Sequence, residues 1–179
     1  PMVCVIEAMG RHAGWLTAAA ALAGVNGLGA DLIYLPETDF DVDKFVEDVK
    51  GVCAKNGNKC IAVVSEGIHD KEGTLICESL GSQAARDSFG HAQLGGVASI
   101  LANLLKEKTG FKTRGIELSL MQRCGAHLAS ETDVEEAFNA GAFAVKSACE
   151  GETDKMVIFK RVIDENGNYH CENVLMPLE

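Results

Sequence analysis

The chain has 179 residues, 47 % of them hydrophobic and 23 % charged, with a formal net charge of −10. This composition suffices for one packed domain, or one and a fraction, and excludes disordered and low-complexity chains. The acidic balance leaves no basic surface, so we expect neither nucleic acid nor a membrane as a partner. Seven cysteines without a paired CxxC motif indicate free thiols in a reducing compartment, and we expect a cytoplasmic protein.

The first half of the chain alternates between short apolar segments and helical patterns. Three segments are almost wholly apolar and rich in β-branched residues, and we expect them to be strands: 3–8, 31–35 and 60–64. An alanine-rich stretch over 11–23 predicts a buried helix. A second helix is expected over 42–55, with Asp41 as its N-cap and its apolar side chains on one face.

The second half opens with an irregular stretch, 68–90, where mixed charge and several glycines indicate a loop or lid with a short helix. Periodicity and capping signals then predict a helix over 95–109, a strand over 111–122, a helix from Thr132 or Asp133 to Glu150, and a strand over 156–163 that ends in an Asn-Gly hairpin turn. Strands that alternate with helices predict an α/β fold: a doubly wound, mainly parallel sheet with helices on both faces.

Charged residues gather where the expected strands end. Ligands of doubly wound sheets bind at the carboxyl ends of the strands. The expected ends carry two arginines, a carboxylate and their neighbours: Met9, Gly10, Arg11, Glu66, Gln122 and Arg123. Because guanidinium groups suit phosphate oxygens and carboxylates suit sugar hydroxyls, this edge predicts a site for a small phosphorylated polyol. The alternative interpretation is that these residues are charged only because strand ends are solvated.

Other polar motifs indicate less chemistry. Cys124 and His127 have the spacing of two metal ligands, but no second ligand pair stands near them, so we expect no metal site in this chain. His12 either reaches the anion-binding edge or caps its helix. His69 lies in loop-like sequence and is expected to be solvated. The residues thus predict a binding edge and no catalytic base.

At Met9-Gly10-Arg11-His12-Ala13-Gly14-Trp15-Leu16 the chain resembles the fructose-6-phosphate half of the 6-phosphofructokinases. Further matching pieces occur in the family's order and at roughly its spacing, up to about residue 150: Leu-Pro-Glu at 35–37, Val-Ser-Glu-Gly at 64–67, Thr113-Arg114 and Gln122-Arg123. One tripeptide is a weak match, whereas the ordered set is specific.

The resemblance implies roles for residues that the strand ends already bring together. It implies that Met9, Gly10 and Arg11 hold the sugar phosphate, and that Arg11 also stabilises charge in the transition state. It implies that Glu66 binds the hexose hydroxyls. Arg123 would contact the 6-phosphate or the transferring group.

Arg114 lies nine positions before Arg123. On one strand these positions span about 30 Å, so the two guanidinium groups cannot hold one phosphate within a subunit. In the family, the residue that matches Arg114 reaches the 6-phosphate across a subunit interface, which implies a homodimer or homotetramer. The alternative interpretation of Arg114 is a solvated residue at the start of a strand.

For the whole protein, the resemblance implies phosphoryl transfer from ATP or pyrophosphate to the 1-hydroxyl of fructose 6-phosphate in glycolysis, with Mg²⁺. The family's glycine-rich donor loop and its aspartate base segment do not occur in these residues. We therefore expect residues 1–179 to be the C-terminal, substrate-binding portion of a longer phosphofructokinase, without turnover of its own. The alternative function is a non-catalytic sugar-phosphate sensor or regulatory module of the same fold.

Two departures from the family pattern bear on the phosphoryl donor. Leu120 stands where ATP-dependent members carry a histidine, and Cys124-Gly125 stands where they carry two glycines. The residues around these positions are slightly closer to the pyrophosphate-dependent or unassigned bacterial branches of the family, and the sequence leaves the choice between ATP and pyrophosphate open.

Overall fold

The computed structural model of the chain describes residues 1–80 and 96–178. Two compact units divide the chain: the first unit is Pro1–Cys124 and the second unit is Gly125–Glu179. The expected loop or lid lies outside the described residues from residue 81 onward. Within the described ranges, no helix is long and apolar enough to cross a membrane.

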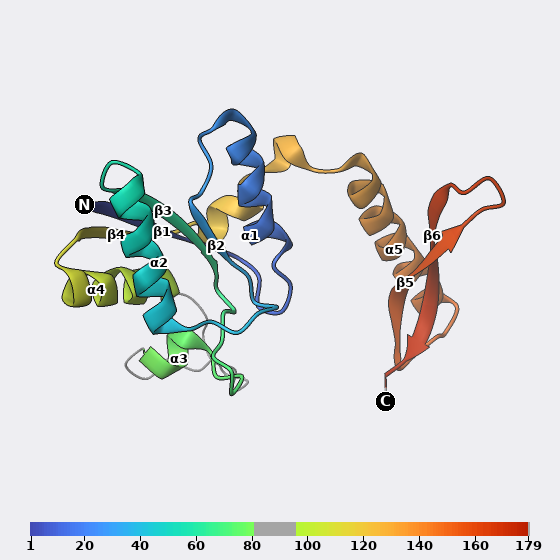
Figure 1. The fold of residues 1–179 in the computed structure, drawn as a ribbon. Helices are drawn as coiled ribbons and strands as arrows, with labels where there is room; N and C mark the ends of the chain where they lie inside the picture. Colours follow the sequence, from blue (N-terminus) through green and yellow to red (C-terminus); the bar gives the residue numbers. More distant parts are fainter. Residues whose placement is uncertain (81–95, 179) are drawn as a thin grey trace. The chain divides into compact units, whose positions relative to one another are not determined.

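The first unit is built around a parallel four-stranded sheet (Figure 1). In spatial order its strands are β2 (Leu32–Tyr34), β3 (Lys59–Ser65), β1 (Met2–Ala8) and β4 (Lys112–Glu117). β1 pairs in parallel with β3 on one side and with β4 on the other, so the carboxyl ends of the three strands meet at one edge. The parallel sheet and its helices confirm the doubly wound α/β fold that the sequence predicts.

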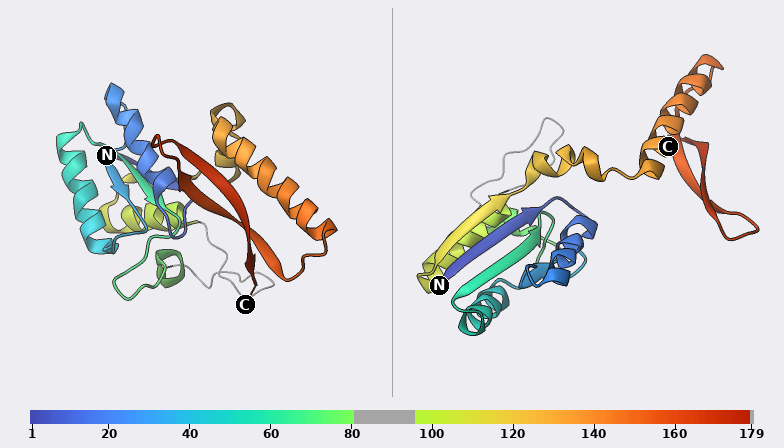
Figure 2. Two further views of the ribbon diagram at one scale, coloured as in Figure 1. Left: turned by 90° about the vertical axis from the view of Figure 1, so that its right-hand side faces the viewer. Right: turned by 90° about the horizontal axis from the view of Figure 1, so that it is seen from above.

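One face of this sheet forms the core. It packs against α2 (Val42–Lys55) and α4 (Val97–Thr109) (Figure 2). The buried apolar side chains come from these strands and helices, from the loop residues Phe40 and Ile68, and from the short helix α3 (Ile76–Leu80). As predicted, Asp41 caps α2, because its carboxylate accepts the Lys44 backbone N–H at 2.8 Å. Gly115 of β4 lets α4 approach closely, since a Cβ there would lie 2.8 Å from the helix backbone.

The opposite face is only partly covered. α1 (Trp15–Ala19) lies there, followed by the 3-10 helix η1 (Ala20–Asn26). The prediction of one buried helix over 11–23 is wrong. The helix begins only after Gly14, and Trp15 is 84 % exposed. The late start has a local cause, because the Gly14 N–H donates to a carboxylate of the loop that follows β2 instead of joining a helical turn.

The strand expected over 111–122 is also shorter than predicted. β4 ends at Glu117, and Ser119–Cys124 form the 3-10 helix η2. Ser119 has a φ of 42°, a left-handed conformation that takes the chain out of the sheet. Arg123 therefore lies on η2, and the separation from Arg114 that one continuous strand would impose does not apply.

The second unit holds the 3-10 helix η3 (Ala126–Leu128), α5 (Glu131–Cys149) and an antiparallel hairpin of β5 (Lys155–Ile163) and β6 (Tyr169–Pro177). α5 packs along the hairpin (Figure 2). The N-cap of α5 is Ser130 and not the predicted Thr132 or Asp133, because the Ser130 hydroxyl accepts the Asp133 N–H at 3.3 Å.

Candidate functional site

The carboxyl ends of β1 and β3 and the 3-10 helix η2 enclose a pocket of about 320 Å³. We call it the sugar pocket, after the phosphorylated polyol that the sequence predicts as its ligand. Five residues that the sequence places at the expected ligand edge line it together: Met9, Gly10, Glu66, Gln122 and Arg123. The exposed side chains of Trp15 and Leu16 line it as well. The pocket thus combines a carboxylate, a guanidinium group and an apolar wall.

Hydrogen bonds from two sides hold the segment that follows β1. Gln122 Oε1 accepts the Met9 N–H at 2.8 Å, and Glu66 Oε1 accepts the Gly10 N–H at 3.2 Å. The Ser65 hydroxyl donates to the Gly10 carbonyl. These bonds fix the Glu66 side chain through one oxygen, and its second oxygen can accept a hydrogen bond from a ligand hydroxyl.

Two glycines allow the close approach of the strand ends. A Cβ at Gly67 would lie 1.9 Å from the carbonyl oxygen of Arg11. Gly10 has a φ of +143°, and a Cβ there would lie 2.5 Å from the Ala13 carbonyl oxygen. Only glycine satisfies both positions without moving the backbone.

The predicted placement of Arg11 at a helix N-terminus is wrong. α1 begins four residues later, at Trp15, and has only five residues. The N–H groups of Gly10 and Gly14 donate to carboxylates of the protein itself. These two N–H groups are therefore not available to an anion.

Glu7 is a buried carboxylate next to this site to which the sequence assigns no role. It is 5 % exposed, and its Oε2 accepts the backbone N–H of Ala98, in the first turn of α4, at 3.0 Å. Burial raises the pKa of the Glu7 carboxyl group, the Ala98 hydrogen bond opposes that rise, and the neighbouring Glu117 carboxylate adds to it. The sequence signal that could have identified Glu7 is the presence of a charged residue inside an apolar strand.

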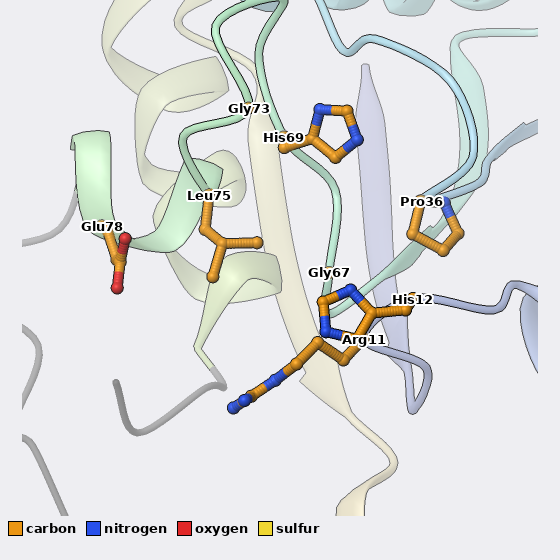
Figure 3. Close-up of a pocket in the computed structure, with 8 residues that line it drawn as sticks. All are labelled: Arg11, His12, Pro36, Gly67, His69, Gly73, Leu75 and Glu78. Atoms are coloured by element: carbon orange, nitrogen blue, oxygen red, sulfur yellow. The ribbon is translucent and has the colours of Figure 1, made fainter. Parts of the chain in front are cut away.

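Arg11 lines a second cavity, of about 500 Å³, together with His12 and His69 (Figure 3). His69 is half-buried there and lines the cavity. The described residues contain no group of three or more His, Cys, Asp or Glu side chains that could hold a metal ion.

Arg114 lies apart from both cavities. It is exposed on β4 and pairs with Cys4, five residues before Met9, which corresponds to about 16 Å along the sheet. The structure thus gathers four of the six predicted binding residues in the sugar pocket, places Arg11 beside it and leaves Arg114 towards the other end of the strands.

The parallel sheet and its helices define the chain as a doubly wound α/β protein, and ligands of this class of protein bind at the carboxyl edge of the sheet. The family model described as phosphofructokinase matches residues 1–158, and the chain belongs to this family.

Individual relatives agree with this membership. A pyrophosphate–fructose 6-phosphate 1-phosphotransferase of Xanthomonas campestris pv. campestris is 45 % identical over 177 residues, which are 98 % of this chain and 41 % of that protein. A sulfofructose kinase of Alkalicoccus urumqiensis is 31 % identical over 99 % of this chain and 44 % of its own length. The crystal structure of a pyrophosphate-dependent phosphofructokinase from Nitrosospira multiformis superimposes with a TM-score of 0.61 at 32 % identity, over 98 % of this chain and 39 % of that one. The chain spans about two fifths of the length of these relatives.

Proposed function

We propose that this chain is the fructose-6-phosphate-binding portion, the C-terminal one, of a phosphotransferase that makes fructose 1,6-bisphosphate. The observation that carries the proposal is the sugar pocket, where Glu66 and Arg123 converge on the Met9-Gly10 backbone. The names of the relatives support fructose 6-phosphate as the acceptor.

Each polar group of the pocket has a role that its chemistry allows. Glu66 accepts hydrogen bonds from hexose hydroxyls through one oxygen, while its other oxygen stays on the Gly10 N–H. Arg123 binds phosphoryl oxygens, with the fork of N–H donors that a guanidinium group offers. Arg11, beside the pocket, neutralises the charge that spreads over the transferring phosphoryl group.

The phosphoryl donor in this proposal is pyrophosphate. The relatives that are 43–45 % identical to this chain are named for pyrophosphate, which supports it over ATP. A base for the 1-hydroxyl and a Mg²⁺ site are assigned to the part of the longer enzyme that binds the donor. We therefore expect residues 1–179 alone to form no fructose 1,6-bisphosphate from either donor.

Arg114 is assigned to the site of a second subunit. It is exposed, and it lies too far along β4 to reach the sugar pocket of its own subunit. This assignment requires a homodimer or a homotetramer, in which Arg114 contacts the 6-phosphate bound by its neighbour.

Isothermal titration with fructose 6-phosphate tests the proposal. We expect Glu66→Gln and Arg123→Ala each to weaken binding by about tenfold or more, because a hydrogen bond to a charged group contributes roughly 1.5–3 kcal/mol. Arg161→Ala, an exposed arginine of β5 in the second unit, is the matched control and should leave the affinity unchanged. Unchanged affinity in both pocket variants, or binding of sulfofructose in place of fructose 6-phosphate, would contradict the proposal.

A further inference from the structure

Glu7 is a buried carboxylate on the core face of β1, and the proposed function does not use it. Val3 and Val5 precede it on the same face of the strand, and both are 0 % exposed. A carboxylate is costly to remove from water, and an apolar residue would pack in its place at less cost. Its presence two residues before Met9 therefore points to a role that packing does not explain.

The partner of the Glu7 side chain is the first turn of α4. This helix begins after Gly96, which has no side chain to cap it. Glu7 Oε2 accepts the Ala98 N–H at 3.0 Å, across 91 positions of the chain. Burial raises the pKa of the Glu7 carboxyl group, whereas the Ala98 and Val97 N–H groups both lower it, so both amides act on this carboxylate. Val97 and Ala98 are fully buried, and without Glu7 their N–H groups would lose this partner.

The main chain of Glu7 binds the segment that carries Arg123. The Glu7 carbonyl oxygen accepts the Leu118 N–H at 3.1 Å, directly after β4 ends. Two residues further along the chain, the Met9 N–H donates to Gln122 of η2 at 2.8 Å. The chain after β4 is thus attached to the end of β1 at Glu7 and again at Met9, and Arg123 directly follows the second attachment.

α4 contacts β4 at the same place. A Cβ at Gly115 would lie 2.8 Å from the carbonyl carbon of Ala98, the residue whose N–H binds Glu7. Because α4 meets both β1 and β4 at Ala98, a shift of its first turn would displace the two strands just before the ligand edge. We propose that Glu7 is a positioning residue of the sugar pocket: its carboxylate fixes α4 to β1, and this contact keeps η2 and Arg123 in place to bind the ligand.

The neighbouring carboxylates indicate that this position requires reach and not charge. Glu117 and Glu66 both raise the pKa of Glu7 by electrostatic repulsion, so a negative charge there is opposed from the end of β4 and from the end of β3. The Ala98 N–H needs only an oxygen acceptor. Glutamine supplies such an oxygen at the same reach, and aspartate, which is shorter by one methylene group, does not. This inference rests on the proposed function, because it takes the sugar pocket as the site of the ligand.

Titration of Glu7→Gln, Glu7→Asp and Glu7→Leu with fructose 6-phosphate tests the inference. Glu7→Asp and Glu7→Leu should weaken binding by about tenfold, because a displacement of about 1 Å removes much of the interaction of a positioned group. Glu7→Gln should bind as the wild type does. Glu7→Asp keeps the test open if Glu7→Leu does not fold.

Thr113→Val is the matched control. The Thr113 hydroxyl donates to the Ala102 carbonyl of α4 at 2.7 Å, so this variant also loses a hydrogen bond between α4 and the sheet. Thr113 pairs with Val3, four residues before Glu7, which corresponds to about 13 Å along the sheet. The control should lose stability in urea unfolding and keep its affinity for fructose 6-phosphate.

Amide chemical shifts of the ligand-free variants test the positioning without the sugar phosphate. We expect Glu7→Asp and Glu7→Leu to shift the amides of Gln122 and Arg123 as well as that of Ala98, whereas Glu7→Gln and Thr113→Val leave Gln122 and Arg123 in place. A residue that only stabilises the fold would lower the unfolding midpoint without moving these two amides.

The results separate this inference from the proposed function. Wild-type affinity in Glu7→Asp and Glu7→Leu, with the Arg123 amide unmoved, would overturn the inference and leave the sugar pocket intact. An equal loss of affinity in Thr113→Val would also overturn it, since any lost contact of α4 would then suffice. No binding of fructose 6-phosphate by the wild type would contradict the proposed function instead, and the Arg123 amide shift would still decide whether Glu7 holds η2.

Discussion

The two units bury their apolar side chains very differently. In the first unit, the side chains of Val3, Val5 and Leu101 are 0 % exposed between the sheet and its helices. In the second unit, Phe138 of α5 and Phe159 of β5 are 75 % and 57 % exposed, and Ser147 is the one buried residue among those described. A parallel sheet with two helices on one face makes its own core, whereas one helix on a hairpin does not. The ligand edge belongs to the unit with the core, which can hold its residues rigidly.

Truncation of one large side chain in each unit should give the largest difference between the units in the free energy of unfolding. Leu101→Ala should reduce the free energy of unfolding by about 2–5 kcal/mol, because it leaves a cavity in a fully buried site. Phe138→Ala should change it by less than about 0.5 kcal/mol, because that ring is mostly in solvent. Denaturant unfolding of both variants measures the two values. Similar losses would mean that the second unit has a core of its own.

Within the first unit, an added methyl group should destabilise the ligand edge more than it destabilises the surface of a helix. Gly67→Ala should cost about 1–3 kcal/mol and abolish fructose 6-phosphate binding, since the new Cβ would overlap the Arg11 backbone. The control is Gly51→Ala in α2, where a Cβ meets nothing and where alanine should stabilise the helix by about 0.5–1 kcal/mol. Thermal unfolding and sugar-phosphate titration measure both effects. Wild-type binding by the Gly67 variant would show that the close approach is unnecessary.

The helix caps extend the comparison to a smaller effect. Asp41→Ala should lower the free energy of unfolding of the first unit by about 1 kcal/mol, because α2 is part of the core. Ser130→Ala removes the equivalent bond from α5 and should reduce helicity at its first turn without moving the unfolding transition of the first unit. Circular dichroism and tryptophan fluorescence, which reports on Trp15, distinguish the two outcomes. A shift of the fluorescence transition in the Ser130 variant would show that the units unfold together.

The pH dependence of Glu7 gives the smallest effect. Burial raises the pKa of this carboxyl group in the folded state, so the folded chain holds a proton that the unfolded chain releases. The associated stability is present below the ordinary pKa of 4.5 and is lost as the pH rises through the folded-state pKa. Glu7→Gln keeps an acceptor for the Ala98 N–H and does not titrate, so its stability relative to wild type should rise from pH 4.5 upward. A constant difference over that range would exclude Glu7 as the cause.

The strands and long helices could be predicted from the sequence because their signals are local. Apolar runs mark β1 and β3, and Asp41 marks the start of α2. The meeting of Glu66 and Arg123 was also predictable, since the carboxyl ends of parallel strands share one edge, although η2 rather than a strand delivers the arginine.

What the sequence could not predict depends on contacts between distant residues or on single dihedral angles. The alternation of apolar residues continues past Glu117, and only the left-handed backbone of Ser119 ends β4. The hydrogen bond from the Met9 N–H to Gln122 joins residues 113 positions apart, so no local sequence pattern predicts it. The same holds for His69, whose place in a cavity depends on the segment after β1.

The most direct test of the ligand site is a titration of the ¹⁵N-labelled chain with fructose 6-phosphate, followed by amide chemical shifts. The proposed function predicts that the largest shifts fall on Met9, Gly10, Glu66 and Arg123, and that amides of the second unit stay in place. Shifts centred on residues outside the sugar pocket, or no shifts at saturating ligand, would contradict the proposal that the edge of β1, β3 and η2 binds the sugar phosphate.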